Sequence, residues 1–158
     1  MLDLGCGAGE KSLWLAEQGY RVTGVDISET AIRQAEAARS TDDNPRFLRG
    51  DLAELDRLSL GAHAFGLVLD LVSSQFLTAD QQSALWTHVR SLIAPGGLMI
   101  HTRLEPTGSD APTWVQELAV SPQEFEQRLA GFSVLSHSTS PSANLADTTV
   151  HRYVLKAE

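Results

Sequence analysis

Cysteine is nearly absent from this chain of 158 residues: Cys6 is the single one, so no internal disulfide can form. Small domains in oxidising compartments commonly depend on disulfides, so this composition predicts a reducing compartment. Long apolar runs are missing too, because none approaches the roughly 20 residues that span a bilayer. Residues 1–9 lack the charged, apolar and small-residue zones of a signal peptide. We therefore expect a cytoplasmic protein with no membrane partner.

Positive charge is scarce: 12 Lys and Arg residues stand against 20 Asp and Glu residues, which gives a formal net charge of −8. A nucleic-acid-binding face needs clustered cations, so we expect no nucleic-acid partner and a small neutral or cationic ligand instead. The five histidines show no metal-ligand spacing, so no metal site is predicted. With 42% hydrophobic and 20% charged residues, the composition predicts a single globular domain over residues 1–158.

Glycine, in contrast, is concentrated at the start of the chain, where residues 1–9 are Met-Leu-Asp-Leu-Gly-Cys-Gly-Ala-Gly. Glycines after a short apolar strand let the backbone turn without Cβ clashes and leave amide groups free to meet a ligand. Asp26 ends the next apolar run, where the ribose of a bound nucleoside would lie, and its carboxylate can accept from both hydroxyls. These features predict a nucleoside-type cofactor. Asp26 could also cap the following helix, or do both.

Apolar residues further along the chain alternate between strand and helix periods. We predict helices over residues 11–18, 28–38, 80–93 and 121–129, a loop over 40–45, and strands over 2–4, 21–25, 46–49, 65–71, 98–102, 133–138 and 150–156. Strands that alternate with helices pair in parallel, whereas the last two strands are typical of a hairpin. The predicted fold is α/β: a doubly wound, Rossmann-like, mostly parallel sheet of about seven strands with an antiparallel C-terminal edge.

Five short segments follow one another in a recognisable order: Asp3–Gly9, Val25–Ser28, Gly50–Leu52, Phe65–Leu71 and Leu92–Gly97. Together they resemble the class I S-adenosylmethionine-dependent methyltransferases, whose acid-x-Gly-x-Gly-x-Gly loop matches the first segment and whose Leu-x-Pro-Gly-Gly turn matches the last. The resemblance covers nearly the whole chain and lacks only what precedes the first strand. It implies that S-adenosylmethionine is the cofactor.

The resemblance also implies roles for individual residues. Asp3 would lie near the methionyl amine, Asp26 would bind the ribose hydroxyls, and Asp51 would accept from the adenine amino group. Asp51 could instead be a turn residue that follows Gly50. The implied cofactor-binding residues are Asp3, Gly5, Gly7, Gly9, Asp26, Ile27, Asp51 and Leu52.

A dinucleotide such as NAD is disfavoured by the residue at position 10. A dinucleotide-binding fold would want its third glycine there for close helix packing, but this chain has Glu10 and places the glycine at position 9. A glutamate in the first helical turn would also repel a pyrophosphate. S-adenosylmethionine has no phosphate and carries two cationic groups, so acidic residues around the loop favour it. An NAD-linked oxidoreductase is therefore only a distant alternative.

Catalysis of methyl transfer depends mainly on alignment and a dry cleft, because the reaction is an in-line displacement. A base is needed only for weakly acidic nucleophiles. We predict His101 and Asp70, at neighbouring strand ends, as catalytic residues. Equally, His101 could be a packed strand residue, and Asp70 could cap or orient the loop that follows it.

The turn after the fourth strand narrows the substrate class by exclusion. Its sequence, Asp-Leu-Val-Ser over residues 70–73, departs from the Asn/Asp-Pro-Pro-aromatic turn of enzymes that methylate exocyclic or amide nitrogens. It looks more like the turn of small-molecule methyltransferases.

Cys6 is interpreted as a packed side chain, and Trp14 and Trp86 as core or groove residues on helical stripes.

The first predicted strand lies at the very start of the sequence, so we expect the helices that cover the cofactor in the family to be absent and the pocket to be open. A shortened start, a lid supplied by another subunit, or a fold kept for binding alone would each explain this. A homo-oligomer is therefore possible. The leading hypothesis is S-adenosylmethionine-dependent methyl transfer to a small-molecule acceptor. The alternative is a noncatalytic methyltransferase-like subunit that binds a cofactor or a partner.

Overall fold

A computed structural model describes residues 1–41 and 43–158 of the chain. Asp42, inside the predicted loop over 40–45, lies outside the described residues. The strands are β1 (Leu2–Leu4), β2 (Thr23–Asp26), β3 (Arg46–Arg49), β4 (Phe65–Leu71), β5 (Ile93–Pro106), β6 (Phe132–Pro141) and β7 (Thr148–Ala157). The α-helices are α1 (Glu10–Glu17), α2 (Glu29–Ala37), α3 (Ala79–Leu92), α4 (Thr113–Glu117) and α5 (Pro122–Arg128), and two 3₁₀ helices are η1 (Leu52–Arg57) and η2 (Ser73–Phe76).

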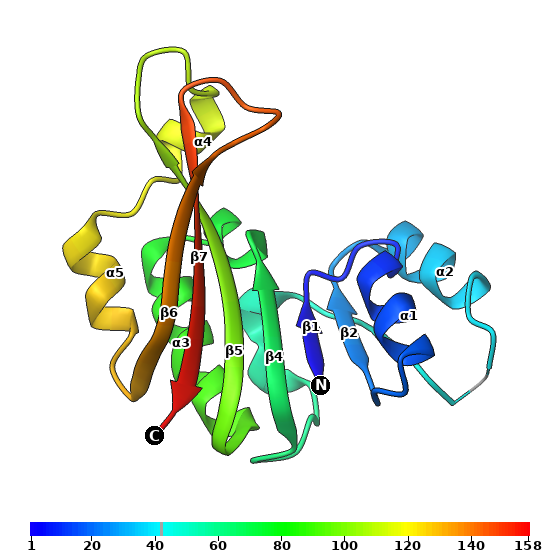
Figure 1. Ribbon diagram of the computed structural model, residues 1–158. Helices are drawn as coiled ribbons and strands as arrows, with labels where there is room; N and C mark the ends of the chain where they lie inside the picture. Colours follow the sequence, from blue (N-terminus) through cyan, green and yellow to red (C-terminus); the bar gives the residue numbers. More distant parts are fainter. Residues whose placement is uncertain (42) are drawn as a thin grey trace.

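The strands form one seven-stranded sheet in the order β3-β2-β1-β4-β5-β7-β6 (Figure 1). The pairs from β3 to β5 are parallel, whereas β7 pairs antiparallel with both β5 and β6. This confirms the predicted fold class, including its antiparallel edge. Because β1, β2, β4 and β5 all run the same way, their carboxyl ends meet along one edge, where ligands bind in open α/β sheets.

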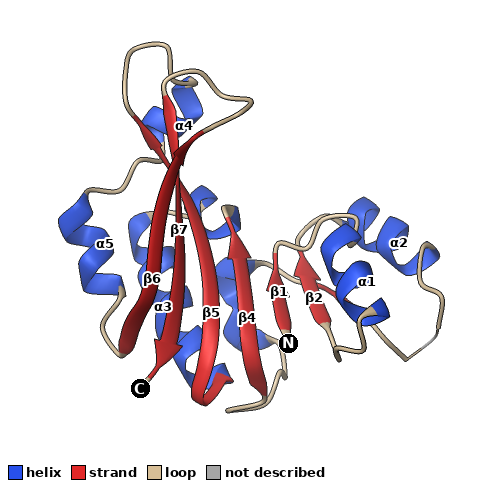
Figure 2. Cartoon of the chain, in the orientation of Figure 1, coloured by secondary structure: helices blue, strands red, loops and turns tan. Residues whose placement is uncertain are grey.

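Helix α3 lies behind β5 to β7 and α5 lies beside β6, and both helices contribute residues to the main core (Figure 2). Trp86 of α3 is 1% exposed and places its ring edge-on against three other rings, those of His101, Phe125 and Phe132. The predicted packing of Trp86 is confirmed. The prediction for Trp14 is wrong: its side chain is 59% exposed, because α1 turns Ser12 and not Trp14 toward the sheet.

The segment after α3 differs from the predicted boundaries. The helix ends at Leu92, and β5 already begins at Ile93, the last residue of the helix predicted over 80–93. The Pro-Gly-Gly turn lies inside β5, at an irregularity in its pairing with β4, and Gly96 has a positive φ of 73°. Within the described residues, no helix is long and apolar enough to cross a membrane.

Candidate functional site

The glycine loop between β1 and α1 is held by its own backbone. The amides of Gly5 and Cys6 donate to Val25 O at 2.8 and 3.0 Å, and the amide of Gly7 donates to Asp26 Oδ2 at 2.8 Å. The three glycines have positive φ angles of 69°, 56° and 83°, which only glycine adopts without strain. The expectation that these amides would be free to meet a ligand is therefore wrong for Gly5, Cys6 and Gly7. The loop instead gives the site its shape.

Gly5 also makes room for a neighbouring loop. A Cβ at this position would lie 2.0 Å from Ser73 Oγ and 2.4 Å from Ser73 Cβ, so Ser73 would have to shift to admit any side chain there. At Gly7, by comparison, a Cβ would have no atom within 4 Å. The missing side chain of Gly5 therefore lets the chain after β4 approach the chain after β1.

Cys6 is packed beneath the glycine loop, where its Sγ would lie 2.8 Å from a Cβ at Gly24. Burial raises the pKa of the Cys6 thiol to about 12, and the carboxylates of Asp3 and Asp26 act in the same direction. A thiol with so high a pKa is protonated at neutral pH and is a poor nucleophile. The structure therefore supports the interpretation of Cys6 as a packed side chain.

Asp26 uses both carboxylate oxygens to organise the backbone around it. Oδ2 accepts from the Gly7 amide and Oδ1 accepts from the Ser28 amide, each at 2.8 Å. The helix cap of α2 is Ser28, whose Oγ accepts from the Ala31 amide at 3.2 Å. Each carboxylate oxygen has a second lone pair, so Asp26 can hold this backbone and still accept from hydroxyl donors.

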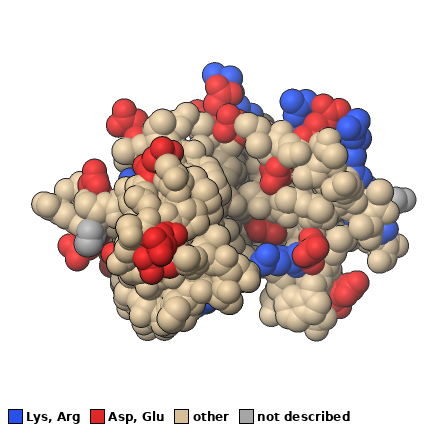
Figure 3. Space-filling model, turned by 90° about the horizontal axis from the view of Figure 1, so that it is seen from above, with Lys and Arg blue, Asp and Glu red and all other residues tan. Residues whose placement is uncertain are grey.

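A cavity of about 490 Å³ opens beside Asp26 at the carboxyl edge of the sheet. Its volume lies within the range of small-molecule sites. Figure 3 looks down on this edge and shows a hollow between the two sides of the molecule, with acidic and basic side chains beside it. The lining residues are Gly5, Asp26, Ile27, Asp51, Leu52, Ser73, Phe76, Leu77 and Gln81.

Five of the eight predicted cofactor-binding residues thus line one cavity: Gly5, Asp26, Ile27, Asp51 and Leu52. Gly7 and Gly9 belong to the adjoining loop, and Gly9 forms the left-handed N-cap of α1. Asp51 also caps η1, because its Oδ1 accepts from the Ala53 amide at 2.9 Å. The turn role considered for Asp51 is therefore present together with its place in the cavity wall.

Asp3 lies elsewhere. Its side chain is 3% exposed, and its Oδ2 accepts from Ser12 Oγ at 2.7 Å, which ties β1 to α1. Burial raises the pKa of Asp3, while the Ser12 hydrogen bond and the charge of Lys11 act against this shift. Asp3 is not among the residues that line the cavity, so its place beside a methionyl amine stays a prediction.

Asp70 and His101, the two predicted catalytic residues, are neighbours in the register of β4 and β5 and bond to each other. His101 Nδ1 lies 3.0 Å from Asp70 Oδ2, and the carboxylate also accepts from the amide and the hydroxyl of Ser74. Asp70 is 0% and His101 3% exposed, and the imidazole stacks on Phe125 with centroids 5.3 Å apart. Neither residue lines the 490 Å³ cavity, so their catalytic roles stay predictions.

The turn that leads from β4 into η2 is strained. Val72 has φ 78° and ψ −19°, a left-handed conformation that is rare for a β-branched residue. The next residue in the cavity wall is Ser73, followed by Phe76, whose ring stacks on Trp114 with centroids 5.4 Å apart. Sequence reasoning missed Phe76, Leu77 and Gln81 as wall residues. The signal for Phe76 and Leu77 is weak, because the short 3₁₀ helix η2 and its cap have no periodicity in the sequence, whereas Gln81 lies in the first turn of α3.

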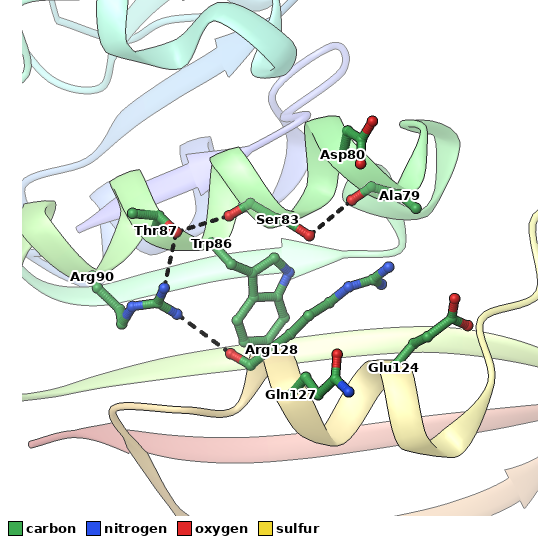
Figure 4. A pocket seen from close by; sticks show the side chains of 9 residues that line it. All are labelled: Ala79, Asp80, Ser83, Trp86, Thr87, Arg90, Glu124, Gln127 and Arg128. Carbon is green, nitrogen blue, oxygen red and sulfur yellow. Dashed lines mark hydrogen bonds between the residues drawn. The ribbon is translucent and has the colours of Figure 1, made fainter.

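A second cavity, of about 340 Å³, lies between α3 and α5 (Figure 4). Charges of both signs line it: Asp80 and Glu124 against Arg90 and Arg128. Arg90 is already engaged, because it donates to Arg128 O and to Thr87 Oγ1. None of the predicted site residues lines this cavity. Within the whole of the described ranges, 1–41 and 43–158, no cluster of three or more His, Cys, Asp or Glu residues is placed to hold a metal ion.

Comparison with known proteins shows which family this chain resembles. A family model described as a methyltransferase domain matches residues 1–97. The chain is 30% identical over 145 residues to the trans-aconitate 2-methyltransferase of Deinococcus radiodurans, which covers 89% of this chain and 51% of that protein. It is 37% identical over 107 residues to the ubiquinone biosynthesis O-methyltransferase of a Caulobacter species, which covers 68% of this chain and 41% of that protein. The chain thus spans about half the length, or less, of these relatives.

Solved structures show the same fold. The 1,6-didemethyltoxoflavin-N1-methyltransferase of Burkholderia thailandensis, solved with S-adenosylhomocysteine, superposes with a TM-score of 0.78 at 23% identity, covering 99% of this chain and 69% of that one. A methyltransferase from Methanosarcina mazei also gives 0.78, at 21% identity, covering 99% of this chain and 91% of that one. At these identities the likeness concerns the arrangement of strands and helices.

Proposed function

The chain belongs to the S-adenosylmethionine-dependent methyltransferases of class I, and on this premise we propose that it transfers a methyl group to a small-molecule acceptor. The observation that carries the proposal is the meeting of Gly5, Asp26, Ile27, Asp51 and Leu52 around one cavity. These residues come from the carboxyl ends of β1, β2 and β3 and from the loops that follow them, which are remote from one another in the sequence.

The hydrogen-bond acceptors and apolar side chains that line this cavity suit S-adenosylmethionine. Asp26 offers carboxylate lone pairs for a ribose diol, Asp51 offers an acceptor for an adenine amino group, and Ile27 and Leu52 offer apolar surface for a base. When bound, the cofactor supplies a methyl group made electrophilic by the sulfonium. Acidic side chains around the hollow attract its two cationic groups (Figure 3).

The contribution of the chain to the reaction would be alignment and exclusion of water. Ser73 and Phe76 form the wall of the cavity on the β4 side, where a predicted acceptor would meet the methyl group. The name of one relative includes a small organic acid, trans-aconitate, and that of one structural neighbour includes 1,6-didemethyltoxoflavin, which supports a small-molecule acceptor. The net charge of −8 disfavours RNA, although one relative is a ribosomal RNA methyltransferase. A cytoplasmic location and a homo-oligomer stay predictions, as does the single domain over residues 1–158.

Isothermal titration calorimetry with S-adenosylmethionine and S-adenosylhomocysteine tests the proposal. We expect both to bind to the wild type. A protein that binds neither at millimolar concentration would refute the cofactor assignment for this cavity. Incubation with methyl-labelled cofactor and fractionated metabolites then tests transfer. Binding without transfer to any fraction would favour the noncatalytic subunit over the enzyme.

A further inference from the structure

The strained turn after β4 is held in place from two sides. On one side, Asp70 accepts from the Ser74 amide at 3.0 Å and from the Ser74 hydroxyl, while His101 Nδ1 binds the same carboxylate. A carboxylate only accepts hydrogen bonds, so the Nδ1 atom of His101 carries the proton in this pair. The imidazole itself is fixed by its stacking on Phe125.

On the other side, Gln75 locks the turn to the neighbouring strand. Its side-chain amide donates to Leu104 O at 2.9 Å, and its carbonyl oxygen accepts from the Leu104 amide at 2.8 Å. The Val72 amide donates to Thr102 O at 3.0 Å. Strained backbone persists only where the surroundings over-determine it, and these bonds over-determine the left-handed Val72.

The conformation of this turn determines where two residues of the cavity wall lie. Ser73 directly follows the strained residue and lies close enough to Gly5 that a Cβ there would clash. Phe76, at the end of η2, lines the same cavity. If Val72 adopted an extended conformation, both wall residues would change their position relative to the glycine loop.

We propose that His101 and Asp70 are positioning residues, which hold Val72 in its left-handed conformation and thereby set Ser73 and Phe76 against the glycine loop. This inference rests on the proposed function, because it treats the cavity as the cofactor site. The two residues act through the turn, and neither lines the 490 Å³ cavity. The near-complete burial of the pair and its absence from the cavity lining agree with this role.

Two substitutions of His101 separate positioning from acid–base catalysis. His101→Phe keeps a ring on Phe125 but removes the donor to Asp70. His101→Asn keeps a side-chain nitrogen at the Nδ1 position and removes the titratable group. We expect His101→Phe to weaken S-adenosylhomocysteine binding about tenfold, the scale of the conformational cost at Val72, and His101→Asn to stay within about threefold of wild type.

A third substitution tests the link to Val72 directly. Glycine adopts a φ near 78° without steric cost, so Val72→Gly should make the turn independent of the His101–Asp70 bond. In the His101→Phe background, we expect Val72→Gly to restore binding of S-adenosylhomocysteine to within about threefold of wild type. A role limited to general stability predicts no such recovery.

The outcomes are distinct. Equal losses of binding in His101→Phe and His101→Asn, no loss in His101→Phe, or no recovery with Val72→Gly would each overturn the positioning role. If His101→Phe does not fold, Ser74→Ala removes the hydroxyl donor to Asp70, and we expect it to weaken binding about threefold. Unchanged binding in that variant would count against the proposal.

Amide hydrogen exchange in the absence of ligand separates this inference from the proposed function. We expect residues 72–76 to exchange faster in His101→Phe than in His101→Asn. If wild type fails to bind S-adenosylhomocysteine, the proposed function fails, whereas this exchange difference still tests the role of the pair. Equal exchange in the two variants would overturn the positioning role even if the cofactor binds.

Discussion

The two halves of the sheet, β1 to β3 and β4 to β7, form their parts of the cavity wall in different ways. On the β1–β3 side, the loops are shaped by backbone: left-handed glycines, amides bonded to Val25 O, and Asp26 bonded to two amides. On the β4–β7 side, the wall is held by buried side chains, above all Asp70, His101 and the rings around Trp86. The first side can therefore be read from short motifs, whereas the second depends on contacts between distant residues.

The largest expected effect concerns the packing side. Trp86→Ala would leave a cavity among the rings of His101, Phe125 and Phe132, and should lower the free energy of unfolding by about 3–5 kcal/mol. Urea denaturation followed by circular dichroism measures this loss. Trp86→Phe, which keeps most of the ring volume, is the matched control and should lose much less. Equal stability of wild type and Trp86→Ala would remove the contrast between the two sides.

On the glycine-loop side, the expected effect is chemical protection of Cys6. Because burial raises the pKa of its thiol from 9.0 to about 12, the thiolate fraction at pH 8 should be about a thousandfold smaller than in the unfolded chain. Alkylation by iodoacetamide should accordingly be slow for the native protein and fast in urea. Similar rates in both would show that the loop exposes its side chains as well as its backbone.

Gly5→Ala tests the point where the two sides touch. We expect a loss of about 1–3 kcal/mol from the clash with Ser73, in addition to about 1–2 kcal/mol for a left-handed alanine. Gly7→Ala, with open space around its Cβ, should lose only the second part. Thermal denaturation compares the two variants. In the double variant Gly5→Ala/Ser73→Gly the clash should disappear, and persistence of the full loss would contradict close approach of the loops.

The last of these effects concerns ligand binding by the carboxylate of Asp26. Asp26→Ala should weaken S-adenosylhomocysteine binding at least tenfold, since hydrogen bonds to a charged group contribute about 1.5–3 kcal/mol each. Calorimetry measures the change. Ser28→Ala removes the cap of α2, which costs about 1 kcal/mol of stability, but leaves the carboxylate in place. Equal weakening by Ser28→Ala would mean that Asp26 acts only through the local backbone.

The sequence predicted the glycine-loop side well, because its determinants are local. The glycine spacing, the acidic end of β2 and the Asp51 turn each lie within a few residues, and Gly5, Asp26 and Asp51 meet around one cavity, while their contacts with a cofactor stay predictions. The amide partners of the loop could not be foreseen, since Val25 O and Asp26 become available only when β1 and β2 pair.

The other side was predicted less completely. His101 and Asp70 were identified as residues of interest, but their mutual bond joins positions 31 residues apart and depends on the register of β4 and β5. The stacking of Phe76 on Trp114 likewise has no local signal. For Trp14 the sequence predicted packing that the structure does not show. An apolar stripe in a short helix does not reveal which of its residues faces the sheet.

The close approach of Gly5 and Ser73 has a consequence for how this chain can evolve. Any side chain at position 5 requires the segment after β4 to retreat, so a tolerated change there must be matched by a change in the β4–η2 turn. Positions 5 and 73 should therefore covary among homologues, with glycine retained at the first wherever the second bears a side chain. Substitutions in the loop after β1 and in the loop after β4 would then depend on each other, although the two loops belong to different halves of the sheet.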